Sequence, residues 1–281
     1  MNILKVISVL TLVALFSCKQ APAPPDERYE LSEPSEDKMV EEIVPPEAKR
    51  VNVAPSREDE TFNVAYLMGK FDPAKHPAFV KMAPPFADNN ERYLRKDAYE
   101  AFQQMHAAAA KDGVKLTIIS ATRNFEAQKG IWEAKWTGAR LVDDQDISKT
   151  IADPRQRALK ILEYSSMPGS SRHHWGTDID LNDLNDAHFQ SGEGKKVYQW
   201  LRAHAHEYGF CQPYSPKGLD RPDGYNEEKW HWSYMPVSKK LTALASQKLK
   251  DEMIDGFKGA ETAKSIGIVE KYVLGINQEC L

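Results

Sequence analysis

Two histidines and two acidic residues in this sequence have the types and spacing of a metal-dependent hydrolytic site. Residues 171–180 contribute His173 and Asp180, and a second stretch, about fifty residues further on, contributes Glu228 and His231. Catalytic zinc sites commonly have three protein ligands drawn from histidine and carboxylate side chains, and they keep a further position for water or substrate. We therefore predict that His173, Asp180 and His231 bind one Zn2+ ion and that Glu228 remains available as a general base.

The first stretch needs a strand to present its carboxylates. Residues 177–181 alternate in character and predict a short strand, on which Asp178 and Asp180 share one face because side chains two apart point the same way. Gly176 precedes this strand and permits a tight turn. That turn is expected to bring His173 back toward Asp180.

The second stretch predicts another strand, at residues 230–234, which carries His231. Glu228 lies three residues earlier and would face away from His231 on a continuous strand, so we expect a turn or bulge between them. Hydrolysis also needs a cation beside the negative charge that develops on the substrate oxygen. Arg123, just after a predicted strand that ends at Ser120, is the best candidate for this cation.

The remaining pattern predicts an α+β domain, because helices and strands are interspersed without the regular spacing of βαβ units. We expect a small antiparallel sheet that carries the zinc site and is flanked by helices. Apolar periodicity and helix-capping residues predict helices at 94–112, 124–136, 153–164, 197–208 and 241–257. A β-rich run at 114–120 predicts a further strand, and the residues from 62 to about 90 are expected to be irregular.

The motifs that carry these residues resemble those of a known family. Residues 171–180 are similar to the SxHxxGxAxD motif of VanY-type D-alanyl-D-alanine carboxypeptidases, which belong to a wider group with lysostaphin-type peptidases and hedgehog domains. Residues 228–234 resemble the ExWHxxY motif of that family, and residues 120–128 resemble its SxYRSxxxQ segment. The similarity extends from about residue 90 to residue 236.

This resemblance implies the same zinc ligands and the same base. It also implies that Arg123 stabilises the transition state and that Ser171 and Gln128 contact the substrate. Two departures from the family pattern flank Arg123, where Thr122 replaces tyrosine and Asn124 replaces serine. The third departure is Asp178, which stands where the family has alanine and adds a carboxylate to the metal-facing side of the predicted strand.

The implied function is zinc-dependent removal of the C-terminal D-alanine from peptidoglycan stem peptides in the bacterial cell envelope. Two alternatives stay open from the sequence. One is an L,D-carboxypeptidase or a peptidoglycan endopeptidase with the same zinc site, and the other is a catalytically silent lipoprotein that binds peptidoglycan. The formal net charge of −4 gives no electrostatic basis for a nucleic-acid partner.

The N-terminal residues differ in composition from the rest of the chain. Residues 1–18 contain one charge and an apolar run, which is typical of a secretory signal peptide. The run ends in a lipobox-like context at Cys18, so we predict lipidation of this cysteine and anchoring to a membrane, facing the periplasm or the cell surface; a plain secretory signal is the alternative. Residues 19–60 are rich in proline and acidic residues and predict a disordered tether. The peptidase domain is then expected at 61–281.

Two cysteines remain if the first is lipidated. Cys211 and Cys280 lie in the predicted domain. An even number of cysteines in an oxidising compartment permits one disulfide. The sequence leaves a bridge and two free thiols as equal alternatives.

Overall fold

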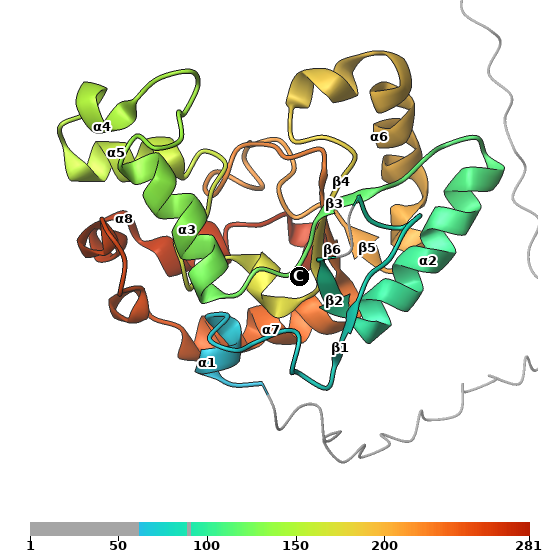
Figure 1. Ribbon diagram of the computed structural model, residues 1–281, viewed down its shortest axis with the longest axis horizontal. Helices are drawn as coiled ribbons and strands as arrows, with labels where there is room; N and C mark the ends of the chain where they lie inside the picture. Colours follow the sequence, from blue (N-terminus) through green and yellow to red (C-terminus); the bar gives the residue numbers. More distant parts are fainter. Residues whose placement is uncertain (1–61, 89–90) are drawn as a thin grey trace, which may run out of the picture. The chain divides into compact units, whose positions relative to one another are not determined.

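The computed structural model describes residues 62–88 and 91–281, which belong to one structural unit (Figure 1). The predicted signal peptide, the tether and Cys18 lie outside these residues. Within the described part of the chain, no helix is both long and apolar enough to span a bilayer.

A four-stranded antiparallel sheet with the strand order β3-β4-β6-β5 carries the predicted site. The strands are short: β3 is Ile118–Ser120, β4 is Asp178–Leu181, β5 is Phe210–Cys211 and β6 is His231–Tyr234. In the pairing of β4 with β6, Asp180 lies opposite His231 and Asp178 lies opposite Ser233. The two predicted strands that carry the candidate ligands are therefore direct neighbours.

The two faces of this sheet have different partners, because side chains alternate along β4. Ile179 and Leu181 are fully buried among apolar residues of α2, Lys96–Lys111, and α6, Gly192–His204. The aspartates of β4 point to the opposite face. In Figure 1, α2 and α6 lie on one side of the sheet and α3, Phe125–Trp136, lies on the other.

The remaining elements are short. A second sheet pairs β1, Phe79–Lys81, with β2, Tyr93–Arg95. The other helices are α1, Val64–Leu67; α4, Ile147–Thr150; α5, Pro154–Ile161; α7, Met235–Lys248; and α8, Ala263–Ile266. Asn124 and Asp153 cap α3 and α5 with side-chain oxygens that accept backbone N–H groups, as helix-capping residues do. The α+β class predicted from the sequence is confirmed.

Several predicted boundaries are wrong. The helix expected from residue 94 begins at Lys96, because Leu94 pairs with Val80 in the β1–β2 sheet. The segment expected to be irregular holds β1, and β2 overlaps the start of the predicted helix. The strand expected at 114–120 is limited to its last three residues. The helix expected at 241–257 is α7, which begins six residues before the predicted start, at Met235, and ends at Lys248.

Cys211 and Cys280 form a disulfide with a Cα–Cα distance of 5.7 Å, which settles the alternative left open by the sequence. The bond joins β5 to the C-terminal end of the chain. Two hydrogen bonds lie beside it, from the Asn277 backbone N–H to the Pro213 carbonyl at 2.8 Å and from the Asn277 amide to the Gln212 carbonyl at 3.3 Å. The C-terminal segment thus holds the start of the loop that leads to β6.

Candidate metal centre and active site

The three predicted zinc ligands lie together in the structure. Their candidate ligand atoms are all within 4.8 Å of one another, and all three side chains are buried. Asp180 comes from β4 and His231 from β6, while His173 comes from a 3-10 turn, Arg172–Trp175, just before β4. Gly176 closes this turn with a φ of 73°, where an added Cβ would collide with the ring of Phe79.

His173 presents one ring nitrogen to this cluster and uses the other to fix its orientation. Its Nδ1–H donates to the Ala121 carbonyl at 2.8 Å, and Nε2 lies 3.3 Å from Asp180 Oδ2. Burial, followed by the nearby Arg123 guanidinium, lowers the pKa of His173. The imidazole is therefore neutral, with a lone pair on Nε2 directed at the cluster, which is the form that binds a metal.

His231 is oriented by Asp178, the carboxylate that stands where the family pattern has alanine. His231 Nε2–H donates to Asp178 Oδ1 at 2.9 Å, so Nδ1 faces Asp180 Oδ1 at 3.1 Å. The sequence placed Asp178 on the metal-facing side of the strand. In the structure it contacts the far nitrogen of His231 and does not join the ligand cluster, an arrangement that typically raises ligand basicity.

A buried network holds Asp178 in place. Its Oδ2 accepts hydrogen bonds from Thr177 Oγ1 at 2.6 Å and Ser233 Oγ at 3.0 Å, and Arg172 Nε lies 3.2 Å from its Oδ1. Arg172 also donates to Thr242 and Ser233 and stacks over the Trp175 ring at 4.5 Å. Burial acts to raise the pKa of Asp178, but the Arg172 guanidinium and the hydrogen bond from His231 outweigh burial and hold that pKa below its usual range.

The cluster of His173, Asp180 and His231 fits a metal ion for two reasons. Its nitrogen and oxygen donors are of the types that bind zinc, and one buried oxygen lacks a hydrogen-bond partner in the described part of the chain. Asp180 Oδ1 is buried and has no hydrogen-bond partner within the described residues. Ligands about 2.0–2.2 Å from a tetrahedral ion are about 3.3 Å apart, close to the nitrogen–oxygen separations in this cluster. Burial acts to lower the pKa of His231, but the surrounding carboxylates of Asp178, Asp180 and Glu228 outweigh burial and raise that pKa. A cation bound here would replace that proton.

The turn predicted between Glu228 and His231 is present, and it places the Glu228 side chain beside the ligand cluster. The His231 N–H donates to the Glu228 carbonyl at 3.2 Å, which closes a turn, and Glu228 Oε2 lies 3.3 Å from His231 Nδ1. The Glu228 side chain is buried, and burial raises the pKa of its carboxyl. A carboxylate with a raised pKa beside a candidate metal site is suited to act as a general base.

Arg123 lies on the other side of the cluster. Its Nη1 is 3.6 Å from Asp180 Oδ2 and also contacts Ser120 Oγ, while its Nε donates to Gln128 Oε1 at 2.8 Å. The amide of Gln128 in turn donates to the Ser166 carbonyl at 2.8 Å. Gln128 thus positions Arg123, with only part of its amide left for a substrate.

Ser171 is buried, and its hydroxyl has no hydrogen-bond partner among the described residues. It does not line the cavity over the metal cluster, so its contact with a substrate stays a prediction. The neighbouring His174 has a structural role. Its Nδ1 bonds the Arg123 carbonyl at 2.6 Å, its Nε2 accepts the Gly169 N–H at 3.0 Å, and burial lowers its pKa to about 3.

A cavity of about 480 Å3 opens over the cluster. Besides the predicted residues it is lined by Tyr214, Tyr225 and Trp230, and the Tyr214 ring lies 4.6 Å from the His231 ring. Sequence reasoning missed the two tyrosines. They belong to a loop between β5 and β6 that has no periodic pattern, so their approach depends on tertiary structure alone.

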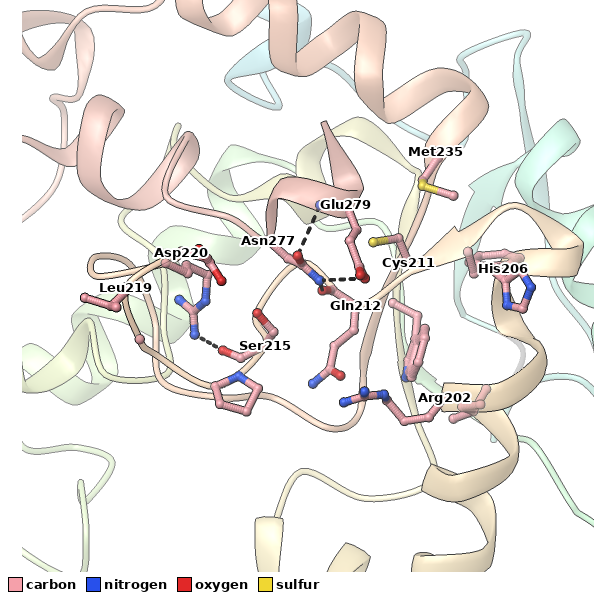
Figure 2. A pocket seen from close by; sticks show the side chains of 16 residues that line it. Arg202, His206, Cys211, Gln212, Ser215, Leu219, Asp220, Met235, Asn277 and Glu279 are labelled. Atoms are coloured by element: carbon pink, nitrogen blue, oxygen red, sulfur yellow. Dashed lines mark hydrogen bonds between the residues drawn. The ribbon is translucent and has the colours of Figure 1, made fainter. Parts of the chain in front are cut away.

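A larger cavity of about 610 Å3 is separate from the cluster of candidate metal ligands. Figure 2 shows Arg202, Gln212, Asn277 and Glu279 around it. None of the three candidate ligands lines this cavity, and neither does Glu228. The smaller cavity is therefore the candidate active site.

Comparisons with known proteins identify the class of this site. The model of the family "VanY: D-alanyl-D-alanine carboxypeptidase" matches residues 91–237, which is more than half of the 281 residues. The chain therefore belongs to the VanY D-alanyl-D-alanine carboxypeptidase family. The matched range contains both motifs and all three candidate ligands.

The individual relatives share 30% or less of their aligned residues with this chain in the following comparisons. The chain is 30% identical over 160 residues to "Putative carboxypeptidase YodJ" of Bacillus subtilis, a match that covers 55% of this chain and 50% of that protein. The chain spans between 50% and 59% of the length of the curated relatives it matches. Among solved structures, the LdcB LD-carboxypeptidase is 22% identical with a TM-score of 0.45, covering 73% of this chain and 81% of that one. A vancomycin resistance D,D-pentapeptidase VanY mutant in complex with Zn(II) is 22% identical with a TM-score of 0.44, covering 65% and 93%.

Proposed function

We propose that this protein is a zinc-dependent carboxypeptidase that removes the C-terminal D-alanine from peptidoglycan stem peptides. The observation that carries the proposal is the cluster of two histidines and an aspartate with Glu228 beside it at 3.3 Å from His231. A module that only binds peptidoglycan has no need of a buried base next to a metal cluster. Membership of the VanY family supports the same substrate class.

In this proposal His173, Asp180 and His231 hold the zinc ion. The ion supplies a Lewis acid that polarises the scissile carbonyl and favours ionisation of the attacking water. Glu228 accepts the proton of that water as the carbon–oxygen bond forms. It then delivers the proton to the leaving amine as the carbon–nitrogen bond breaks.

The other residues of the site position groups and stabilise charge. The Arg123 guanidinium faces the cluster and donates to the carbonyl oxygen as that oxygen becomes negative. Gln128 holds this guanidinium in place. The Tyr214 ring packs against the His231 ring at 4.6 Å.

The product masses of defined stem peptides test the proposed reaction. Incubation of the zinc-loaded protein with a pentapeptide ending in D-Ala-D-Ala is expected to release one alanine and leave a tetrapeptide. Release of alanine from the tetrapeptide alone would make the protein an L,D-carboxypeptidase, and cleavage within cross-linked peptides would make it an endopeptidase. No cleavage of any stem peptide, with peptidoglycan binding retained, would favour the silent binding protein.

We also propose that the protein is exported and held at a membrane by a lipid on Cys18. The Cys211–Cys280 disulfide supports export, because such bonds persist in oxidising compartments. The Cys18→Ser variant is expected to leave the membrane fraction or to accumulate as an unprocessed precursor, because it lacks the thiol that accepts the lipid. Fractionation with detection of the precursor measures this. A Cys18→Ser protein that is processed and still membrane-bound would rule out the lipid anchor.

A further inference from the structure

One wall of the active-site cavity carries positive charge that the proposed reaction does not use. Gln128, Ile131 and Lys135 lie on one face of α3, at spacings of three and four residues. The first two line the cavity, and Lys135 Nζ donates to Ser165 Oγ, another lining group, at 2.6 Å. Arg140 also lines the cavity. Its backbone N–H bonds the Ala134 carbonyl at 2.8 Å, which folds the following turn back over the end of α3.

Neither cation has an acidic partner within 4.0 Å among residues 62–88 and 91–281. The nearby acids, Asp143 and Glu163, both pair with Lys160, at 2.6 and 2.7 Å. Burial and the neighbouring Arg140 lower the pKa of Lys135, and Glu228 across the cavity acts against that shift. A half-buried ammonium with only a hydroxyl as partner is stabilised by an incoming anion.

The distance of Lys135 from Arg123 indicates which carboxylate of a substrate Lys135 can bind. Lys135 is seven residues along α3 from Gln128, the partner of Arg123, and this corresponds to about 10 Å along the helix axis. In a peptide, the C-terminal carboxylate carbon is three bonds from the scissile carbonyl carbon, at most about 4 Å away. A substrate with its scissile carbonyl at Arg123 therefore keeps its C-terminal carboxylate near Arg123, whereas Lys135 lies toward the other end of α3. A carboxylate at the end of a long side chain can reach it.

We propose that Lys135 and Arg140 bind a side-chain carboxylate of the substrate, so that the site selects stem peptides whose diamino acid is diaminopimelate over those with lysine. The two side chains are similar in length, and only the first has a terminal carboxylate. The selection rests on the proposed function, because it assumes that a stem peptide occupies the cavity. Lys135 and Arg140 are then specificity-determining residues outside the metal cluster and its base.

Direct binding tests this selection without turnover. The full chain with Glu228→Gln, loaded with zinc, is titrated by calorimetry with two pentapeptides that differ only in diaminopimelate or lysine. One or two charge-assisted hydrogen bonds predict a Kd at least about tenfold lower for the diaminopimelate peptide. Adding Lys135→Met or Arg140→Met is expected to remove most of this difference and to leave the Kd of the lysine peptide within about twofold.

Lys129→Met is the matched control, because Lys129 is also on α3 but, among the described residues, neither lines the cavity nor bonds a residue that lines it. Equal Kd values for the two peptides would overturn the proposal, and so would a preference that survives both substitutions. Binding of neither peptide would overturn it as well. A failure of the proposed reaction appears separately, as lack of hydrolysis by the unmodified zinc-loaded protein even where the binding preference is present.

Discussion

Replacement of Glu228 by glutamine is expected to lower the turnover of stem peptides by about 10²–10⁴-fold, the typical contribution of a general acid–base residue. Glutamine keeps the size of the side chain but cannot take up the proton of the attacking water. Three other residues supply the metal ligands, so zinc content and folding should be retained. The loss should appear mainly in kcat, because the proton moves in the transition state and not on binding.

Steady-state kinetics and elemental analysis of the same preparation measure this effect. Glu227→Gln is the matched control, because Glu227 is the adjacent acid but interacts with Tyr198 at 3.0 Å and Lys229 at 3.4 Å, away from the cluster. Its turnover should stay close to that of the unmodified protein. A Glu228→Gln protein that binds zinc and hydrolyses peptide at a near-normal rate would disprove the role of Glu228 as base.

Removal of Asp178 is expected to have two separable effects. Asp178→Ala deletes the acceptor for His231 Nε2–H, and loss of such an outer partner typically lowers metal affinity by about 10–100-fold. It also leaves the fully buried Arg172 guanidinium without its counter-charge. Removal of one partner from a buried ion pair costs about 3–5 kcal/mol of unfolding free energy. Chelator competition measures the first effect, and denaturant unfolding of the metal-free protein measures the second.

A double variant, Arg172→Met with Asp178→Ala, separates these effects. Replacing both charges with apolar groups removes the unpaired guanidinium, so most of the unfolding free energy should return. Zinc affinity should stay low, because His231 still lacks its acceptor. His231→Ala gives the reference value for loss of a ligand. A double variant that binds zinc as tightly as the unmodified protein would show that Asp178 serves stability alone.

The strands that carry the ligands could be predicted because their pattern is local. Residues 177–181 and 230–234 alternate around polar side chains of matched type, and the turn before His231 followed from the three-residue offset of Glu228. The β1–β2 sheet could not be predicted in the same way. Its strands have three residues each, too few for a period to show, and they follow a segment rich in proline.

The residues of the site that belong to the two sequence motifs could be predicted. His173, Asp180, His231 and Glu228 lie together as expected, with Arg123 beside them. The contact of Asp178 with the far nitrogen of His231 could not be read from the strand. Face alternation gives the side on which a residue lies, but it does not give the atom that the residue touches. Tyr214 and Tyr225 were missed because tertiary packing alone brings them to the cavity.

The disulfide between Cys211 and Cys280 has a consequence for the choice of domain limits. The family match ends at residue 237, whereas the covalent bond and the hydrogen bonds of Asn277 lie beyond that limit and hold the start of the loop that carries Tyr214. That loop continues into the turn that presents Glu228. A recombinant fragment cut at the family limit would keep every motif residue and lose the covalent tether of the catalytic loop. The structural unit of this protein is therefore longer than the range of the family match.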